Sequence, residues 1–160
     1  MTAQVWIAIL VGLAAIVDDL ARRQIANWIP AAALAGGLGW QIGQHGLWLG
    51  TGYALAGAGV GFLVFLIFYL MGGMGGGDVK LMAGFGALLG LPGVLWAALW
   101  TAAAGGVLAV CMLAAKSIGR RFGGWFGLAR KAATEAPGKE TIPYAPAIAL
   151  GVWLSLVPKG

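Results

Sequence analysis

The sequence predicts an all-α protein that spans the membrane about six times, with its N-terminus outside. The first reason is composition: 61% of the 160 residues are hydrophobic and 9% are charged, whereas a soluble domain has roughly 45–50% apolar and about 25% charged residues. The second is that the apolar residues form long segments, and the third is that the basic residues lie almost entirely in alternate loops. Because no change in composition divides the chain, we expect one membrane domain covering residues 1–160.

Six apolar segments are candidate membrane spans. A helix needs roughly 20 residues to cross a hydrocarbon core of about 30 Å. The first segment ends at the acidic pair Asp18 and Asp19, and the fourth follows a glycine-rich turn. The second, fourth and sixth are short, which added loop residues or a locally thinned bilayer would accommodate. In chain order, we expect spans at residues 3–19, 28–42, 47–70, 79–91, 94–115 and 144–157.

The loop charges set the expected orientation. With the N-terminus outside, nine basic residues and all five acids fall on one face of the membrane, and only Lys159 falls on the other. Short cytoplasmic loops carry an excess of Lys and Arg, so the basic face is expected to be cytoplasmic. Topology thus explains the net charge of +5, and we expect the lipid bilayer, and no nucleic acid, as a partner. The nine residues are Arg22, Arg23, Lys80, Lys116, Arg120, Arg121, Arg130, Lys131 and Lys139.

Glycines predict where two spans pack closely. Gly57-x-x-x-Gly61 lies in the third span and Gly86-x-x-x-Gly90 in the fourth. This spacing gives each helix a face of small residues, which lets membrane helices approach one another.

The longest polar segment is an expected cytoplasmic loop at about residues 116–143. It mixes aromatic with basic side chains. Such a segment is typical of a loop that lies against anionic lipid, and contact with a substrate or partner is the alternative.

Asp78 ends the glycine-rich turn of residues 75–77 and stands at the rim of a span. A charged side chain inside a membrane helix costs roughly 2.5–3.5 kcal/mol at the centre, so an acid kept there suggests a function. Its structural alternative is an N-cap of the fourth span, since Asp is a good cap. The two roles are compatible, and the neighbouring glycines leave room for a peptide backbone to approach.

Asp19, at the end of the first span, is the expected partner of Asp78. The alternative is an ion pair with Arg22 or Arg23 at helical spacing. Two carboxylates at one membrane depth can share a proton, so that one polarises a peptide carbonyl while the other takes a proton from water. Cys111 and His45 are too far apart in the expected topology to act together, and no set of metal ligands is present.

Both acids stand in motifs that resemble those of a known family. Gly75-x-Gly77-Asp78 resembles the Gly-x-Gly-Asp motif of membrane-embedded aspartic proteases. Residues 19–27 resemble the Asp-x5-Ile-Pro-Asn motif of type IV prepilin peptidases, with Ile25 and Asn27 in register. That register selects Asp19 over Asp18.

A third motif follows in the order found in that family. Pro143-Tyr144-Ala145-Pro146-Ala147 resembles the Pro-Tyr-x-Pro-Ala segment that opens the last helix of its short members. One departure is Ala26, which stands where the family has proline, so the turn after Asp19 is expected to be less rigid.

The resemblance implies a peptidase of the bacterial inner membrane. It would remove the basic leader from type IV prepilins or pseudopilins at the cytoplasmic face, typically after a glycine, and bind their N-terminal leader and helix. Asp19 and Asp78 would form the catalytic dyad, with water as the nucleophile. Lys80 would either tune the charge of Asp78 or mark the inner interface, and the second is favoured. The supporting motif residues would be Gly75, Gly77, Ile25, Asn27, Pro143, Tyr144 and Pro146.

The chain lacks the extra N-terminal domain and paired Cys-x-x-Cys of the longer, bifunctional members. It therefore resembles the peptidases of tight-adherence or Flp pilus systems. No cofactor is expected, and neither is N-methylation with S-adenosylmethionine.

Two other functions stay open. A small proton-coupled transporter or channel would use the acids as a relay, although spans 2, 3 and 5 offer no ionisable residue at mid-span. A structural assembly factor would use them only to pair with loop arginines. Proton flux lost with either acid would indicate a transporter, whereas full function without the acids would indicate an assembly factor.

Overall fold

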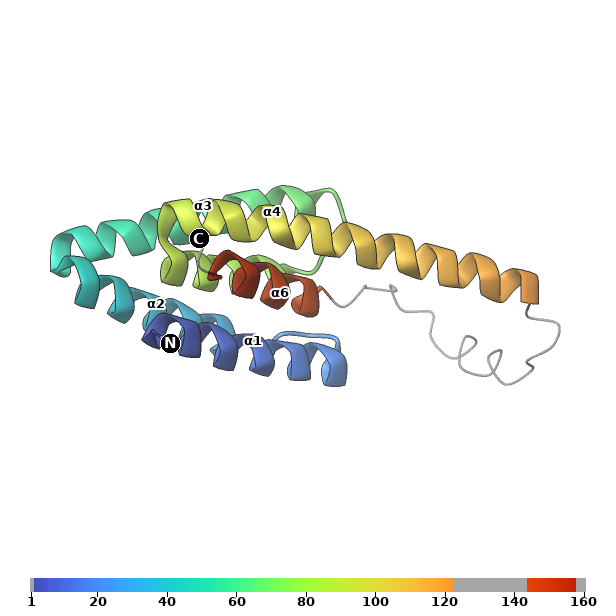
Figure 1. The fold of residues 1–160 in the computed structure, drawn as a ribbon, viewed down its shortest axis with the longest axis horizontal. Helices are drawn as coiled ribbons and strands as arrows, with labels where there is room; N and C mark the ends of the chain where they lie inside the picture. The colour runs from blue at the N-terminus through green and yellow to red at the C-terminus, as the bar shows by residue number, and fades with distance from the viewer. Residues whose placement is uncertain (1, 123–143, 158–160) are drawn as a thin grey trace.

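The described part of the chain folds entirely into helices. The computed structural model describes residues 2–122 and 144–157, and every regular element in these ranges is an α-helix. The predicted all-α fold is therefore confirmed. The helices lie side by side in a bundle, and the end of α4 extends beyond it (Figure 1). They are α1 (Ala3–Arg22), α2 (Trp28–His45), α3 (Leu47–Leu70), α4 (Gly76–Phe122) and α6 (Ala145–Ser155).

Three helices are long and apolar enough to cross a membrane: α1, α3 and the Gly76–Leu108 part of α4. The apolar helix α6 has 11 residues, or about 16 Å of helix, which is shorter than a hydrocarbon core. Large apolar side chains such as Trp48 and Leu55 are exposed on the bundle surface, as expected where a protein faces lipid. The chain is therefore a helical membrane protein, and the count of six spans and the external N-terminus stay predictions.

The helix α4 is interrupted at Gly90. Its φ of 69° and ψ of 179° are not helical, and a positive φ favours glycine. Leu88, just before the break, bonds to Gln4 near the start of α1. Gly105, after the break, faces Tyr144, whose neighbour Ala145 bonds to the end of α1. The chain thus reverses at Gly90, and the expected spans 79–91 and 94–115 are antiparallel parts of α4 (Figure 1).

The break leaves the carbonyl of Leu88 without its helical partner. That partner would be the N–H of residue 92, but Pro92 has none. Two side-chain amides replace it: Gln4 Nε2 donates to the Leu88 oxygen at 3.0 Å, and the buried Gln41 Nε2 donates at 3.2 Å. Two glutamines in apolar helices therefore tie α1 and α2 to the turn in α4.

Replacing either Gln4 or Gln41 with leucine is expected to lower the free energy of unfolding by about 1 kcal/mol, because the other amide still satisfies the Leu88 carbonyl. The double variant leaves that carbonyl unpaired, so its loss is expected to exceed the sum of the single losses by about 1–3 kcal/mol. Denaturation in detergent micelles measures all three variants. If the loss in the double variant equals the sum of the two single losses to within about 0.5 kcal/mol, the two amides do not share the Leu88 carbonyl as an acceptor.

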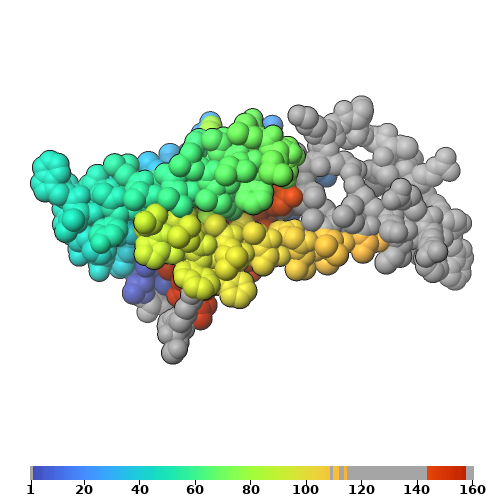
Figure 2. All heavy atoms as spheres, turned by 90° about the horizontal axis from the view of Figure 1, so that it is seen from above, coloured from blue at the N-terminus to red at the C-terminus, as the bar shows by residue number. Residues whose placement is uncertain are grey.

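Glycines bring α3 and the first part of α4 into close contact. A Cβ on Gly57 would collide with the backbone of Gly86, and a Cβ on Gly61 would lie 2.6 Å from the carbonyl oxygen of Met82. These positions belong to the two glycine faces, so their predicted close packing is confirmed. Figure 2 shows α3 and α4 side by side on one surface of the molecule.

The short helix α6 packs in the middle of the bundle. Six of its 11 residues are buried, among them Ile148 and Val152 in the main apolar core. Trp153 Nε1 also donates a hydrogen bond to the carbonyl oxygen of Ala8 in α1 at 3.0 Å. This packing brings the first residues of α6 to the end of α1.

The end of α4 differs from the expectation. The helix continues to Phe122, so residues 116–122 are helical rather than part of a loop. Lysine and arginine, which supply three of these seven residues, are good helix formers, and no proline interrupts this stretch. The rest of the expected loop lies outside the described residues.

Candidate active site

Asp78 is held in the first turn of α4. The helix begins at Gly76, so Gly75 precedes it as the cap and Asp78 is its third residue. Asp78 Oδ2 accepts a hydrogen bond from the Gly75 N–H at 3.1 Å, and the Asp78 N–H donates to the Gly75 carbonyl. The acid of a capping box satisfies the N–H of the cap residue in this way. The alternative that Asp78 is itself the N-cap is therefore wrong, because the glycines already form the first turn.

Asp19 lies in the last turn of α1 and is held by α6. Its Oδ2 accepts a hydrogen bond from the Ala145 N–H at 3.1 Å. Ala145 is the first residue of α6, and N–H groups in the first turn of a helix have no partner within that helix. The start of α6 thus fixes the position of the Asp19 carboxylate.

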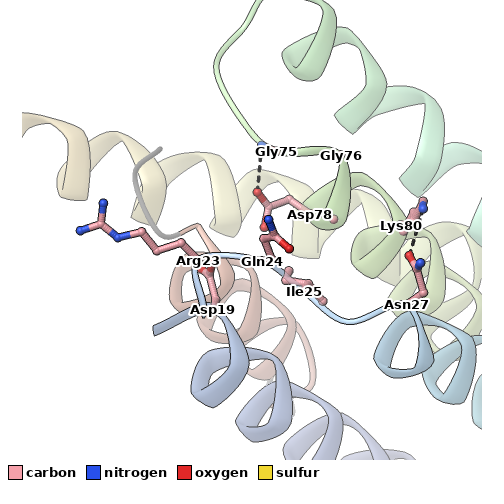
Figure 3. A pocket seen from close by; sticks show the side chains of 10 residues that line it. Asp19, Arg23, Gln24, Ile25, Asn27, Gly75, Gly76, Asp78 and Lys80 are labelled. Carbon is pink, nitrogen blue, oxygen red and sulfur yellow. Dashed lines mark hydrogen bonds between the residues drawn. The ribbon is translucent and has the colours of Figure 1, made fainter. Parts of the chain in front are cut away.

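The two aspartates line one cavity of about 330 Å³ (Figure 3). Asp19 is 7% exposed and Asp78 is 6% exposed, so both acids are largely buried where they line the cavity. The predicted pair is therefore brought together by two helices that are far apart in the sequence. The other residues that line the cavity are Arg23, Gln24, Ile25, Asn27, Gly75, Gly76, Gly77 and Lys80.

Gly77 allows the two motifs to pack against each other. A Cβ at this position would lie 3.1 Å from the Cβ of Ile25, so a side chain would push Ile25 out of place. A Cβ on Gly75 would lie 3.5 Å from Asp78 Oδ2, which is an ordinary contact. The steric need for glycine is therefore greater at position 77 than at position 75.

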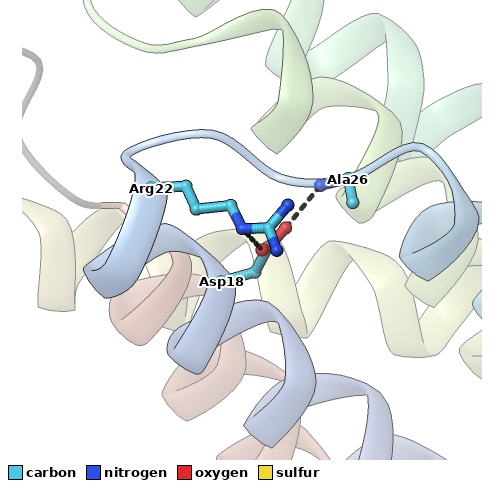
Figure 4. A network of polar contacts seen from close by, with 3 residues as sticks. All are labelled: Asp18, Arg22 and Ala26. Atoms are coloured by element: carbon cyan, nitrogen blue, oxygen red, sulfur yellow. Dashed lines mark hydrogen bonds and ion pairs between the residues drawn. The ribbon is translucent and has the colours of Figure 1, made fainter.

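Asp18 is engaged elsewhere, in the turn between α1 and α2 (Figure 4). Its Oδ2 accepts a hydrogen bond from the Ala26 N–H at 2.7 Å, and its Oδ1 lies 3.4 Å from Arg22 Nε. The ion pair considered for Asp19 is thus formed by its neighbour. This arrangement leaves Asp19 to face the cavity and agrees with the register of the motif.

Polar side chains complete the cavity wall. Arg23 follows α1 with a φ of 53° in the left-handed region, which turns the chain toward Gln24 and Asn27. Lys80 Nζ donates a hydrogen bond to Asn27 Oδ1 at 3.0 Å. Lys80, for which a role at the interface was favoured, thus lies in the wall of the cavity. Sequence reasoning did not single out Arg23 and Gln24 for the site, although their position directly after Asp19 could have indicated them.

The third motif contributes a backbone group. Tyr144 precedes α6 and Pro146 is its second residue, whereas Pro143 lies outside the described residues. The group that reaches the site is the Ala145 N–H, which was not predicted because a backbone donor has no signature in residue type. The available signal was that a helix was expected to begin within this motif, because the first N–H groups of a helix lack partners in that helix and can bond to a nearby carboxylate.

The fold and the site define a helical membrane protein with two buried acids facing one cavity. Comparison with known families matches residues 6–110 to the type IV leader peptidase family, a stretch that includes both aspartates. The chain belongs to the type IV leader peptidase family. Comparison with curated proteins and with solved structures gave no match.

Proposed function

We propose that this protein is an aspartic endopeptidase of the inner membrane that removes the basic leader from type IV prepilins or pseudopilins. The observation that carries the proposal is the shared cavity of Asp19 and Asp78. Membership of the leader peptidase family supports the substrate class. The basic residues beside the site, Arg22 and Arg23, support a cavity that opens toward the cytoplasm.

In the proposed reaction the two carboxylates carry one proton between them. The ionised aspartate takes a proton from a water molecule, which attacks the carbonyl carbon of the scissile peptide, while the neutral aspartate donates its proton to the carbonyl oxygen. The resulting gem-diol collapses as the C–N bond breaks. One proton from a diol hydroxyl returns to the dyad, and the proton taken from water passes to the leaving nitrogen. The dyad thus ends with its single proton, and no covalent intermediate forms.

The hydrogen bonds seen at the site suit this exchange of roles. Each aspartate accepts one backbone N–H through Oδ2, which fixes the carboxyl group and supports negative charge on it. The other oxygen of each carboxylate has no such bond among the described residues. Those oxygens are available for water and for the peptide.

Co-expression with candidate prepilins from the same genome tests the proposal. The expected result is a single new N-terminus, after loss of the basic leader, in the mass of the processed substrate. The same mass would reveal an added methyl group, which we do not expect. Uncut prepilins throughout, although the peptidase is inserted and folded, would overturn the proposal.

A further inference from the structure

Gln24 lies in the short segment between α1 and α2, in the wall of the cavity that holds both aspartates. Hydrogen bonds fix this segment on either side of it. Before it, the Arg23 N–H donates to the Asp19 carbonyl oxygen at 2.8 Å. After it, the Ala26 N–H donates to Asp18 Oδ2 at 2.7 Å. The backbone of Gln24 is therefore held in place beside the site.

The side-chain amide of Gln24, by contrast, is free. The residue is exposed, and its amide has no hydrogen-bond partner within residues 2–122 and 144–157. The side chain extends from its segment toward the Asp78 carboxylate (Figure 3). Because the backbone is fixed and the amide is free, a ligand in the cavity can bond to this amide without breaking an existing contact.

The other polar side chains of the cavity wall are less suited to bind a peptide backbone. In the proposed reaction the two aspartates act on the water molecule and the scissile carbonyl. Arg23 and Lys80 carry donors and no acceptor. Asn27 has both, but its Oδ1 already accepts a hydrogen bond from Lys80 at 3.0 Å. Among the described residues that line the cavity, Gln24 thus supplies the neutral side chain whose donor and acceptor are both available.

A peptide that enters this cavity needs both kinds of group. Its backbone carbonyls are not bonded within a helix where it is cut, so each residue there brings an unpaired N–H and C=O. Leaving them unpaired away from water is costly. In an extended chain, the N–H and C=O of one residue can bond to the same partner, as in a hydrogen-bonded pair of antiparallel strands. A glutamine amide offers the matching donor and acceptor.

We propose that the Gln24 amide binds the backbone of one substrate residue beside the cut and so holds the extended chain across Asp19 and Asp78. Gln24 Nε2 donates to the carbonyl oxygen of that residue, and Oε1 accepts its N–H. This inference rests on the proposed function and adds a substrate-positioning residue to it. Since both bonds are to the backbone, they hold the chain whatever side chain that residue carries.

Gln24→Met tests this inference, because methionine is also unbranched and carries neither amide group. The probe is a synthetic peptide with a basic leader, a glycine at the cut and an apolar segment after it. KM is expected to rise about tenfold, and kcat is expected to stay within about twofold, because the two bonds are made equally before and during the reaction. The melting temperature should not change, since the amide has no partner among the described residues. The matched control is Gln44→Met, which replaces an exposed glutamine near the end of α2, outside the cavity, and should change none of these values.

Peptides in which an ester oxygen replaces a single N–H close to the cut, with the scissile N–H kept, identify the group that Gln24 binds. For one of these peptides, KM with the wild type is expected to be about threefold to tenfold higher than for the parent peptide. With Gln24→Met this difference should vanish, because the partner of that N–H is already gone. A difference that persists in Gln24→Met, an unchanged KM in that variant, or a fall in kcat alone would overturn the role of Gln24 and leave the peptidase intact. If wild-type protein cuts no peptide, the proposed function fails and the role of Gln24 fails with it.

Discussion

Replacing Asp78 with asparagine is expected to abolish leader cleavage, lowering kcat/KM by at least about a thousandfold. Asparagine has nearly the same shape, and its side-chain oxygen can still accept the Gly75 N–H that Asp78 accepts at 3.1 Å. The variant therefore keeps the geometry of the site and loses only the ability to take and give a proton. The same loss is expected for Asp19→Asn. The fraction of processed prepilin, measured by mass spectrometry with equal amounts of inserted protein, checks both.

Asp18→Asn is the matched control, since it changes an adjacent carboxylate in the same turn of α1. Asp18 bonds to Ala26 and Arg22 and does not line the cavity. Cleavage is expected to stay within a few-fold of the wild-type rate. Normal cleavage by Asp19→Asn together with uncut substrate in Asp18→Asn would reverse the assignment of the dyad.

The second large effect is expected from Gly57→Val, which should destabilise the protein by about 3 kcal/mol or more. The new Cβ would collide with the carbonyl group of Gly86, and two packed helix backbones cannot move apart without disturbing α4 on both sides of Gly90. The melting temperature in detergent and the yield of folded protein measure this loss.

Gly59→Val is the control for that experiment, because it adds the same side chain two residues along α3. A Cβ at Gly59 meets nothing within 4 Å, so its melting temperature is expected to stay close to that of the wild type. Equal destabilisation by the two variants would show that valine in α3, rather than contact with Gly86, causes the loss.

The parts of the fold that follow from local pattern could be predicted from the sequence. The apolar segments gave the helices, and the spacing of Gly57 and Gly61 indicated the face that packs on α4. The two motifs indicated Asp19 and Asp78, which the structure places at one cavity. Such signals are readable because each depends on residue type at a fixed spacing.

What could not be predicted depends on contacts between distant parts of the chain. The bond from the Ala145 N–H to Asp19 involves a backbone group with no signature in sequence. The hydrogen bonds from the Gln4 and Gln41 amides to the Leu88 carbonyl could not be predicted, because they depend on the reversal of the chain at Gly90. The position of Asp78 as third residue of α4, rather than its cap, depends on where the glycines begin to turn.

The most direct test of the central claim, that two aspartates from separate helices activate one water molecule, is cleavage in water labelled with heavy oxygen. A single turnover of purified wild-type protein on a leader peptide is expected to place one heavy oxygen in the new carboxyl group of the released leader. Neither Asp19→Asn nor Asp78→Asn should release labelled leader. Labelled leader formed by either variant at the wild-type rate would contradict the account.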